Sequence, residues 1–182
     1  MTPDRFDHVR EIAVMADCHI HPGDGIDWPP AVLDALAGVD LIVTVGDMGE
    51  AAGIAALSSI APVMGVRGAD DEDDPRTAPR ARVVEAGGVR IGCVFDAVGA
   101  GLATVRDPIA PADGVATAEA RLFGGPVAVV LHASTHAPSI EEAAGRLWVN
   151  PGSATLPADK GAGAFARLTV GAGAAEARIV RV

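Results

Sequence analysis

Short apolar runs that end in polar residues divide the first half of the chain. Three of these runs have the length and the flanking residues of buried strands: residues 12–16, 41–45 and 62–66. Two stretches of helical periodicity lie between them, over residues 31–37 and 51–60, and Pro29 and Pro30 suit the first turn of the earlier one. This alternation of strands and helices predicts a parallel sheet, because parallel neighbours need such crossovers.

The second half carries glycine-rich turns, at residues 87–88 and 171–173, each of which separates two apolar runs as in a hairpin. The paired runs are 82–85 with 89–95 and 165–170 with 175–182. Two further strands and one helix are expected at 127–131, 146–149 and 116–122. We therefore expect an α/β (α+β) fold in which a parallel half precedes a more antiparallel half. It would form a four-layer type of β-sandwich, two sheets face to face with helices outside, in a single domain over residues 1–182.

Composition and charge narrow the range of partners. The chain is 49% hydrophobic but only 3% aromatic, which fits a core of aliphatic layers, and its formal net charge is -10. No cluster of lysine and arginine is present, so the sequence argues against a surface that neutralises nucleic-acid phosphates or anionic lipid. A small-molecule ligand is the remaining expectation, and homo-oligomerisation stays open.

Several features favour the cytoplasm. Residues 1–10 carry four charged side chains and no apolar run, so we expect no secretory signal. No stretch approaches the length of a membrane span. Cys18 and Cys93 are too few for a disulfide scaffold, and we expect both to be free thiols in a reducing compartment.

Polar residues follow the three expected strands of the first half. Asp17 comes after the first strand, Asp47 after the second, and the acidic residues 70–74 after the third. Because ligand sites of parallel sheets form at the carboxyl ends of strands, these loops should meet. The carboxylate and imidazole of Asp17 and His19 could then bind one ion. An Asp-x-His spacing alone arises often by chance.

The order of the motifs carries more information than any one of them. Five motifs follow strands in this order: Asp17-Cys18-His19, Gly46-Asp47, Arg67-Gly68-Ala69-Asp70-Asp71, Ala133-Ser134-Thr135-His136 and Asn150-Pro151-Gly152-Ser153. The series resembles the calcineurin-like metallophosphoesterases, over roughly residues 12–157. Within that family it is similar to the small bacterial and archaeal phosphodiesterase branch, which includes the retromer subunit of the same fold.

The resemblance implies one complete metal position and one incomplete one. The first metal of the family would be held by Asp17, His19, Asp47 and His136, all of the expected type. The second would share Asp47 and needs an asparagine and two histidines. The matching positions are Ala69, Phe95 or Asp96, and Ser134, none of which keeps its type.

Neighbouring side chains could rebuild the second position or bind substrate. These are His21, Asp70, Asp71, Asp96, His132 and Ser134. Carboxylates suit Mn²⁺, and imidazoles also suit Zn²⁺, Fe²⁺ or Ni²⁺, so we expect one divalent ion of this group and leave a second open. The structural alternatives are that His132 is a packed imidazole, that residues 70–74 form a solvated acidic loop, and that residues 150–153 form a turn.

Three alternative functions are open, depending on how many divalent ions the chain binds. The resemblance implies a metal-dependent hydrolase, with manganese among the candidate ions, that cleaves a phosphodiester or phosphomonoester of a small substrate by metal-activated water, with weak or altered activity. The second function is a catalytically silent domain of the same fold that binds a partner protein. The third is a mononuclear iron enzyme with non-phosphoryl chemistry. The sequence assigns no catalytic residue beyond the metal ligands.

Overall fold

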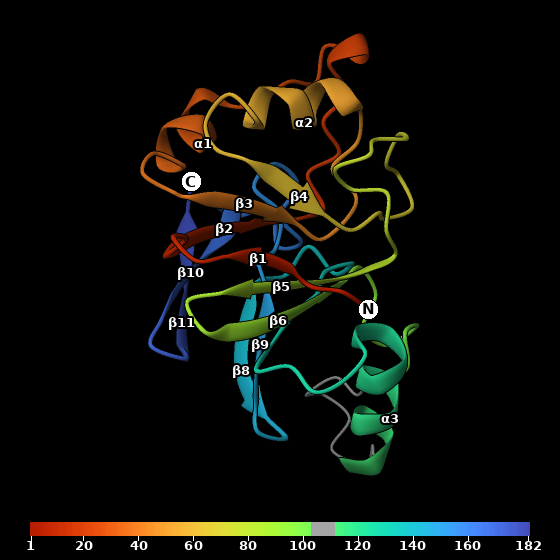
Figure 1. The fold of residues 1–182 in the computed structure, drawn as a ribbon. Helices are drawn as coiled ribbons and strands as arrows, with labels where there is room; N and C mark the ends of the chain where they lie inside the picture. Colours follow the sequence, from red (N-terminus) through yellow and green to blue (C-terminus); the bar gives the residue numbers. More distant parts are fainter. Residues whose placement is uncertain (103–111) are drawn as a thin grey trace.

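The computed structural model describes residues 1–102 and 112–182 (Figure 1). Its first sheet has the strand order β11-β10-β2-β3-β4. Strands β2 (Glu11–Met15), β3 (Leu41–Thr44) and β4 (Val63–Gly65) are parallel, and helices α1 (Pro30–Ala35) and α2 (Ala51–Leu57) connect them. The hairpin of β10 (Ala164–Gly171) and β11 (Ala174–Arg181) completes the sheet, with β10 antiparallel to β2. The parallel half and this hairpin were both expected.

The second sheet has the strand order β1-β5-β6-β7-β9-β8. The hairpin of β5 (Ala81–Ala86) and β6 (Val89–Val94) is confirmed. However, β6, β7 (Val129–Leu131) and β9 (Arg146–Asn150) are parallel. Helix α3 (Ala112–Phe123) lies in the connection from β6 to β7, and β8, which is antiparallel to β9, lies in the connection from β7 to β9. The expectation of a more antiparallel half therefore holds for the hairpins, while the sheet itself is mixed.

Two edge strands were not predicted. Strand β1 (Asp4–Phe6) pairs in parallel with β5, and β8 (Ser139–Ala143) forms a hairpin with β9. Both are half-exposed and rich in polar residues, so they lack the apolar run that marks a buried strand. A strand at a sheet edge can keep such a sequence because its partner supplies the hydrogen bonds.

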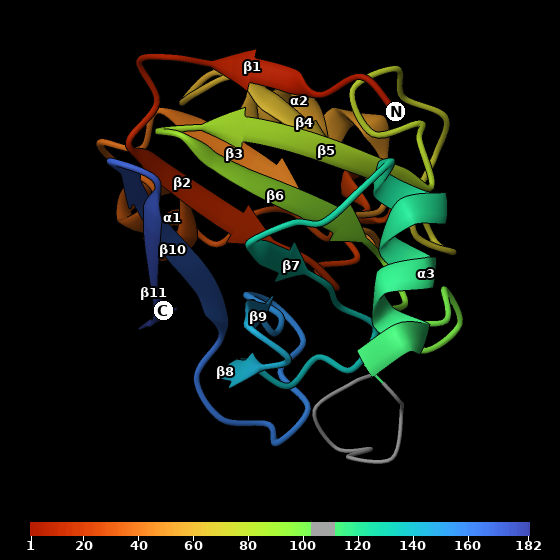
Figure 2. The same ribbon diagram turned by 60° about the horizontal axis from the view of Figure 1, so that its bottom comes forward.

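The core consists of three layers of side chains that hold four layers of backbone together. Ile12, Val43, Ile91 and Leu131 belong to the cluster between the two sheets. A second cluster joins α1 and α2 to the outer face of β2 and β3, and a third joins α3 to the other sheet. Figures 1 and 2 show α1 and α2 beside the first sheet and α3 beside the second. The expected sandwich with helices outside is confirmed.

The two cysteines and the contact between α3 and β6 are buried. Cys18 and Cys93 are free and buried, as expected, and burial raises the pKa of each thiol to about 12. Phe123 of α3 packs so closely on Gly92 of β6 that a Cβ atom there would lie 2.6 Å from the ring.

Among the residues that the structure describes, no helix combines the length and the hydrophobicity needed to cross a membrane.

Candidate metal centre

The loops that follow β2 and β3 lie side by side beyond the ends of their strands. The N–H of Asp17 donates to the carbonyl of Gly46 at 3.0 Å, and the N–H of His19 donates to the carbonyl of Asp47 at 3.0 Å. The loop after β7 joins them, because the N–H groups of Ser134 and His136 donate to the Asp17 carboxylate at 3.3 and 3.0 Å. Loops of both sheets therefore converge on one place.

Backbone strain concentrates in these loops. Eight non-glycine residues of the described chain have a positive φ, and five of them belong to the converging loops: Asp17, His19, Asp47, Ser134 and His136. Each such conformation costs on the order of 1 kcal/mol and persists only where the surroundings impose it. Backbone strain at residues that carry polar side chains is typical of a functional site.

The first carboxylate of the centre is fully buried. Asp17 has no exposed surface, and burial raises the pKa of its carboxyl although the N–H of His136 and the His136 ring oppose the shift. The nearby Asp47 carboxylate raises this pKa further. Two carboxylates so close together are stabilised by a positive charge between them, because each disfavours the ionised form of the other.

Two histidines lie against these carboxylates. The rings of His19 and His136 are stacked, with centroids 5.3 Å apart and an interplanar angle of 10°. Nδ1 of His136 lies 2.7 Å from the carbonyl oxygen of Leu156. Since a carbonyl only accepts hydrogen bonds, a neutral His136 carries its proton on Nδ1 and keeps a lone pair on Nε2.

The donor set of these four residues fits a divalent transition metal. Nε2 of His19 lies 3.9 Å from Oδ2 of Asp47, too far for a hydrogen bond and compatible with two ligands of one ion. Two imidazoles and two carboxylates suit Mn²⁺, Fe²⁺ or Zn²⁺. Asp17, His19, Asp47 and His136 thus lie in neighbouring loops, and their role as ligands to one ion stays a prediction.

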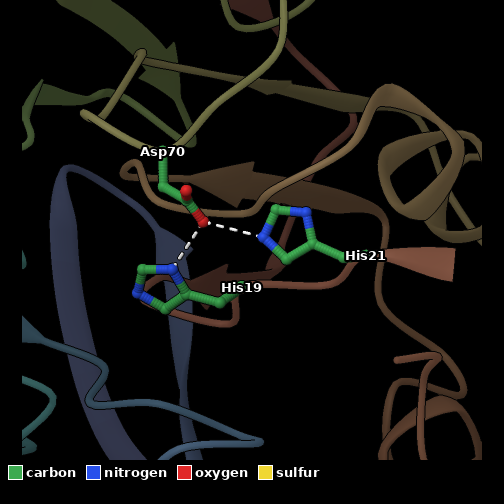
Figure 3. Close-up of side chains that lie close together, drawn as sticks. All are labelled: His19, His21 and Asp70. Carbon is green, nitrogen blue, oxygen red and sulfur yellow. Dashed lines mark hydrogen bonds and ion pairs between the residues drawn. The ribbon is translucent and has the colours of Figure 1, made fainter. Parts of the chain in front are cut away.

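A third carboxylate joins the centre from the loop after β4. Oδ2 of Asp70 lies 2.6 Å from Nδ1 of His19 and 2.9 Å from Nε2 of His21 (Figure 3). Atoms of these three side chains lie within 4.8 Å of one another. Burial opposes the ionised form of Asp70, but hydrogen bonds from His19 and His21 outweigh it and lower the pKa of this carboxyl.

Asp71, the acidic residue next to Asp70, has a structural role. Asp71 is 5% exposed, and its two carboxylate oxygens accept four backbone N–H groups, from Asp47, Met48, Gly49 and Gly68. Asp74 is equally buried and pairs with Arg76. The expectation that residues 70–74 form a solvated acidic loop is therefore wrong for Asp71 and Asp74, because hydrogen-bond donors compensate for their burial.

Comparison with known proteins shows the family of the chain. The model of the calcineurin-like phosphoesterase superfamily domain matches residues 11–173. The chain belongs to the calcineurin-like phosphoesterase superfamily. A probable metallophosphoesterase of Methanothermobacter thermautotrophicus is 31% identical over 148 residues, which span 80% of this chain and 78% of that protein. The family expected from the order of the motifs is thereby confirmed.

Solved structures of this phosphoesterase fold are similar over nearly the whole chain. Vps29 of Chaetomium thermophilum superposes with a TM-score of 0.68 at 24% identity, over 94% of this chain and 97% of that one. Wild-type Vps29 of Entamoeba histolytica, solved in complex with Zn²⁺, gives a TM-score of 0.66 at 21% identity, over 94% and 98%. At these identities the likeness establishes the fold alone.

Two residues that the resemblance matches to a second metal position, Ala69 and Phe95, have apolar side chains. The N–H of Ala69 donates to Oδ1 of Asp47 at 2.5 Å, and its methyl group offers no lone pair. The ring of Phe95 packs on Gly46, where a Cβ atom would lie 2.4 Å from it. Phe95 thus fills space next to the carboxyl end of β3 with an apolar ring.

Asp96, His132 and Ser134 lie along a cavity of about 290 Å³ instead. His132 is half-buried and packs edge-on against Trp148, with ring centroids 6.1 Å apart. Burial lowers the pKa of His132 to about 4, although the Asp96 carboxylate opposes this shift. Asp96 itself accepts the N–H of Gly99 at 2.9 Å. The residues that line this cavity include none of His19, His21 and Asp70.

Three supporting contacts were not foreseen from the sequence. Ser153 donates its hydroxyl to the carbonyl of Asp17 at 2.7 Å, and the side chain of Asn150 accepts the N–H of Gly152 at 2.9 Å. Glu50, at the start of α2, lies 3.7 Å from Nδ1 of His21. The motif of residues 150–153 gave a partial signal for the contacts of Ser153 and Asn150, although Asn150 belongs to β9 and residues 151–153 have no assigned turn, whereas no local pattern marks Glu50.

Proposed function

We propose that this chain is a metal-dependent phosphoesterase that uses one divalent cation held by Asp17, His19, Asp47 and His136. The observation that carries the proposal is the convergence of two buried or half-buried carboxylates and two stacked imidazoles at strained loop positions. A divalent cation at such a site offsets the charge of a phosphoryl group and activates water for attack.

The charges of the centre support a cation as part of the binding site. The carboxylates of Asp47 and Asp70 lie beside His19, and that of Asp17 interacts with Asp47. A phosphate group would be repelled by these carboxylates in the absence of a compensating positive charge. The chain's own contribution is to hold the ligands still. N–H groups fix Asp17, and the Leu156 carbonyl fixes the tautomer of His136.

The cavity beside the centre supports a small organic substrate. Ser134 lines this cavity of about 290 Å³ and also donates its N–H to Asp17, so the cavity and the proposed metal ligands share one loop. The volume is close to the lower end of small-molecule sites, and a nearly neutral His132 together with alanine and proline makes much of the wall uncharged. We propose that it receives the organic group of a phosphate ester.

Metal analysis and hydrolysis test the proposal together. Protein purified without chelator should contain one divalent ion per chain, and bis-p-nitrophenyl phosphate with Mn²⁺ should be hydrolysed slowly. His136→Ala and Asp17→Asn should lose both the ion and the hydrolysis. His8→Ala, which removes an exposed histidine, is the matched control and should keep both. Hydrolysis that survives complete loss of the ion from His136→Ala would contradict the proposal.

A second candidate function has an observation of its own. Ala69 and the packed ring of Phe95 supply no ligand at the second metal position, which supports a domain of this fold that acts by binding a protein rather than by catalysis. One bound ion without hydrolysis of any phosphate ester tested would favour that function. One iron per chain without hydrolysis would favour non-phosphoryl chemistry instead.

A further inference from the structure

Hydrogen bonds link the side chains of His19, Asp70 and His21 into a chain that begins at a proposed metal ligand (Figure 3). Oδ2 of Asp70 lies 2.6 Å from Nδ1 of His19 and 2.9 Å from Nε2 of His21. Nδ1 of His21 in turn lies 3.7 Å from Oε1 of Glu50. The residues come from three separate loops, those after β2 and β4 and the one before α2. Imidazoles and carboxylates alternate along the chain, so each carboxylate faces a nitrogen.

The two nitrogens of His19 face different groups. Nδ1 is within hydrogen-bond distance of Asp70, whereas Nε2 lies 3.9 Å from Oδ2 of Asp47 and makes no hydrogen bond with it. A carboxylate only accepts, so a neutral His19 that is bonded to Asp70 carries its proton on Nδ1. Its lone pair is then on Nε2, which is the nitrogen on the side of Asp47.

The position of Asp70 is itself fixed by contacts on both sides. Its N–H donates to Oδ1 of Asp47 at 2.9 Å, so the same loop contacts a proposed ligand through its backbone and another through its side chain. His21 gives the Asp70 carboxylate a second donor, and the N–H of Gly23 donates to Glu50 at 3.2 Å. The turn of residues 22–24 is thereby tied to the beginning of α2.

We propose that Asp70 is a positioning residue, which holds His19 with Nε2 directed at the cation, and that His21 keeps Asp70 in place. This inference rests on the proposed function. Carboxylates that accept the distal N–H of a metal-bound histidine fix its tautomer and ring orientation, and their loss typically lowers metal affinity by about 10- to 100-fold. Asp70 and His21 would thus stabilise the first metal position rather than rebuild the second.

A cation between His19, His21 and Asp70 is the competing arrangement. It would require Nδ1 of His19 to give up its proton and bind the ion, and a neutral ring would then carry the proton on Nε2. The nitrogen beside Asp47 would lose its lone pair, and the first position would lose one of its four ligands. The two arrangements therefore exclude each other for a neutral His19, and they predict different results for the variants below.

Zn²⁺ affinity, measured by competition with a chromophoric chelator, tests the proposal. Asp70→Ala should weaken Zn²⁺ binding by about 10- to 100-fold at an unchanged stoichiometry of one, and His21→Ala should weaken it by a smaller factor. Asp70→Glu should recover part of the loss, because it keeps the carboxylate. Asp73→Ala is the matched control, since Asp73 lies in the same loop but is 89% exposed and pairs with Arg67 instead.

The tautomer of His19 gives a second measurement that does not need a metal. In metal-free protein the ¹⁵N chemical shifts of His19 should show a proton on Nδ1, and Asp70→Ala should shift this balance toward Nε2 while the control leaves it unchanged. A change in global stability alone would not move this signal. If the wild type binds no metal but shows the expected tautomer shift, the proposed function fails while the positioning role of Asp70 stands.

Two results would overturn the inference. One is a Zn²⁺ affinity of Asp70→Ala equal to that of the wild type. The other is a stoichiometry that falls in both Asp70→Ala and His21→Ala, either from one ion to none or from two ions to one, which would place a cation between these side chains.

Discussion

Asp71 should be the residue of the acidic loop whose removal costs the most stability. Its Oδ1 accepts the N–H of Met48 at 2.5 Å and of Gly49 at 3.1 Å, and its Oδ2 accepts the N–H of Gly68 at 2.7 Å and of Asp47 at 3.2 Å. One carboxylate thereby ties the loop after β4 to the loop after β3. Asp71→Ala would leave these four donors without their acceptor.

The size of the effect follows from the burial of the donors. A hydrogen bond to a charged group contributes about 1.5–3 kcal/mol, and a buried donor left without a partner costs about 1–3 kcal/mol. The four contributions are not additive, because water can enter once the side chain is gone. We therefore expect Asp71→Ala to lower the free energy of unfolding by about 4 kcal/mol, which is exceptional for one substitution. For a chain of 182 residues this corresponds to a decrease in Tm of about 10 °C.

Thermal and urea unfolding followed by circular dichroism would measure this loss. Asp71→Asn should show an intermediate loss, because its amide oxygen still accepts two N–H groups while its amide nitrogen faces the other two as a donor. Asp73→Ala should change the free energy of unfolding by less than about 1 kcal/mol, since Asp73 forms only an exposed ion pair. A loss below about 1 kcal/mol for Asp71→Ala, equal to that of Asp73→Ala, would refute the structural role assigned to Asp71.

Three further predictions concern the centre and its surroundings. Hydrolysis of bis-p-nitrophenyl phosphate with Mn²⁺ should be weak in the wild type, and robust turnover would show that a complete second metal position exists. Ala69→Asn combined with Ser134→His should raise metal content and hydrolysis together, and more than Ala69→Asn alone; a second ion without any gain in hydrolysis would show that missing ligands are not the limiting defect, with the ring of Phe95 as the remaining obstacle. Burial lowers the pKa of His132 to about 4, against about 6.5 in an unfolded chain, so the neutral ring contributes to the free energy of unfolding. This contribution is fully present above about pH 6.5 and is lost as the pH falls to about 4. The contribution is at most about 3 kcal/mol, so unfolding measured from pH 4 to 7 should depend less on pH in His132→Gln than in the wild type, and equal slopes would contradict the shift.

The elements that bury one continuous apolar run could be predicted well. Residues 12–16 and 41–45 coincide with β2 and β3 to within one residue at each end, and the glycine pair at 87–88 gave the turn between β5 and β6. Their signals are local, because a buried strand needs apolar side chains along its own length and a tight turn needs residues that adopt a positive φ. The order of the polar motifs after these strands also identified the family before any geometry was known.

The edge strands and the path of the second sheet were beyond local reasoning. Strands β1 and β8 have polar sequences, and only the hydrogen-bonding groups of β5 and β9 make them strands. The parallel arrangement of β6, β7 and β9 likewise depends on where α3 and β8 return the chain, which no periodicity in the strands records.

The sequence by itself determined which side chains follow the strands, because an apolar run and the polar residues directly after it are consecutive in the chain. It could name Asp17, His19, Asp47 and His136 as a group. Only the tertiary structure separated the roles of Asp70 and Asp71, which are neighbours of the same type. One carboxylate meets His19 across 51 positions of sequence, and the other is buried among backbone N–H groups of two loops. The physical reason is that a carboxylate's role depends on the donors that surround it, and those donors come from loops that only the packing of the sheets brings together.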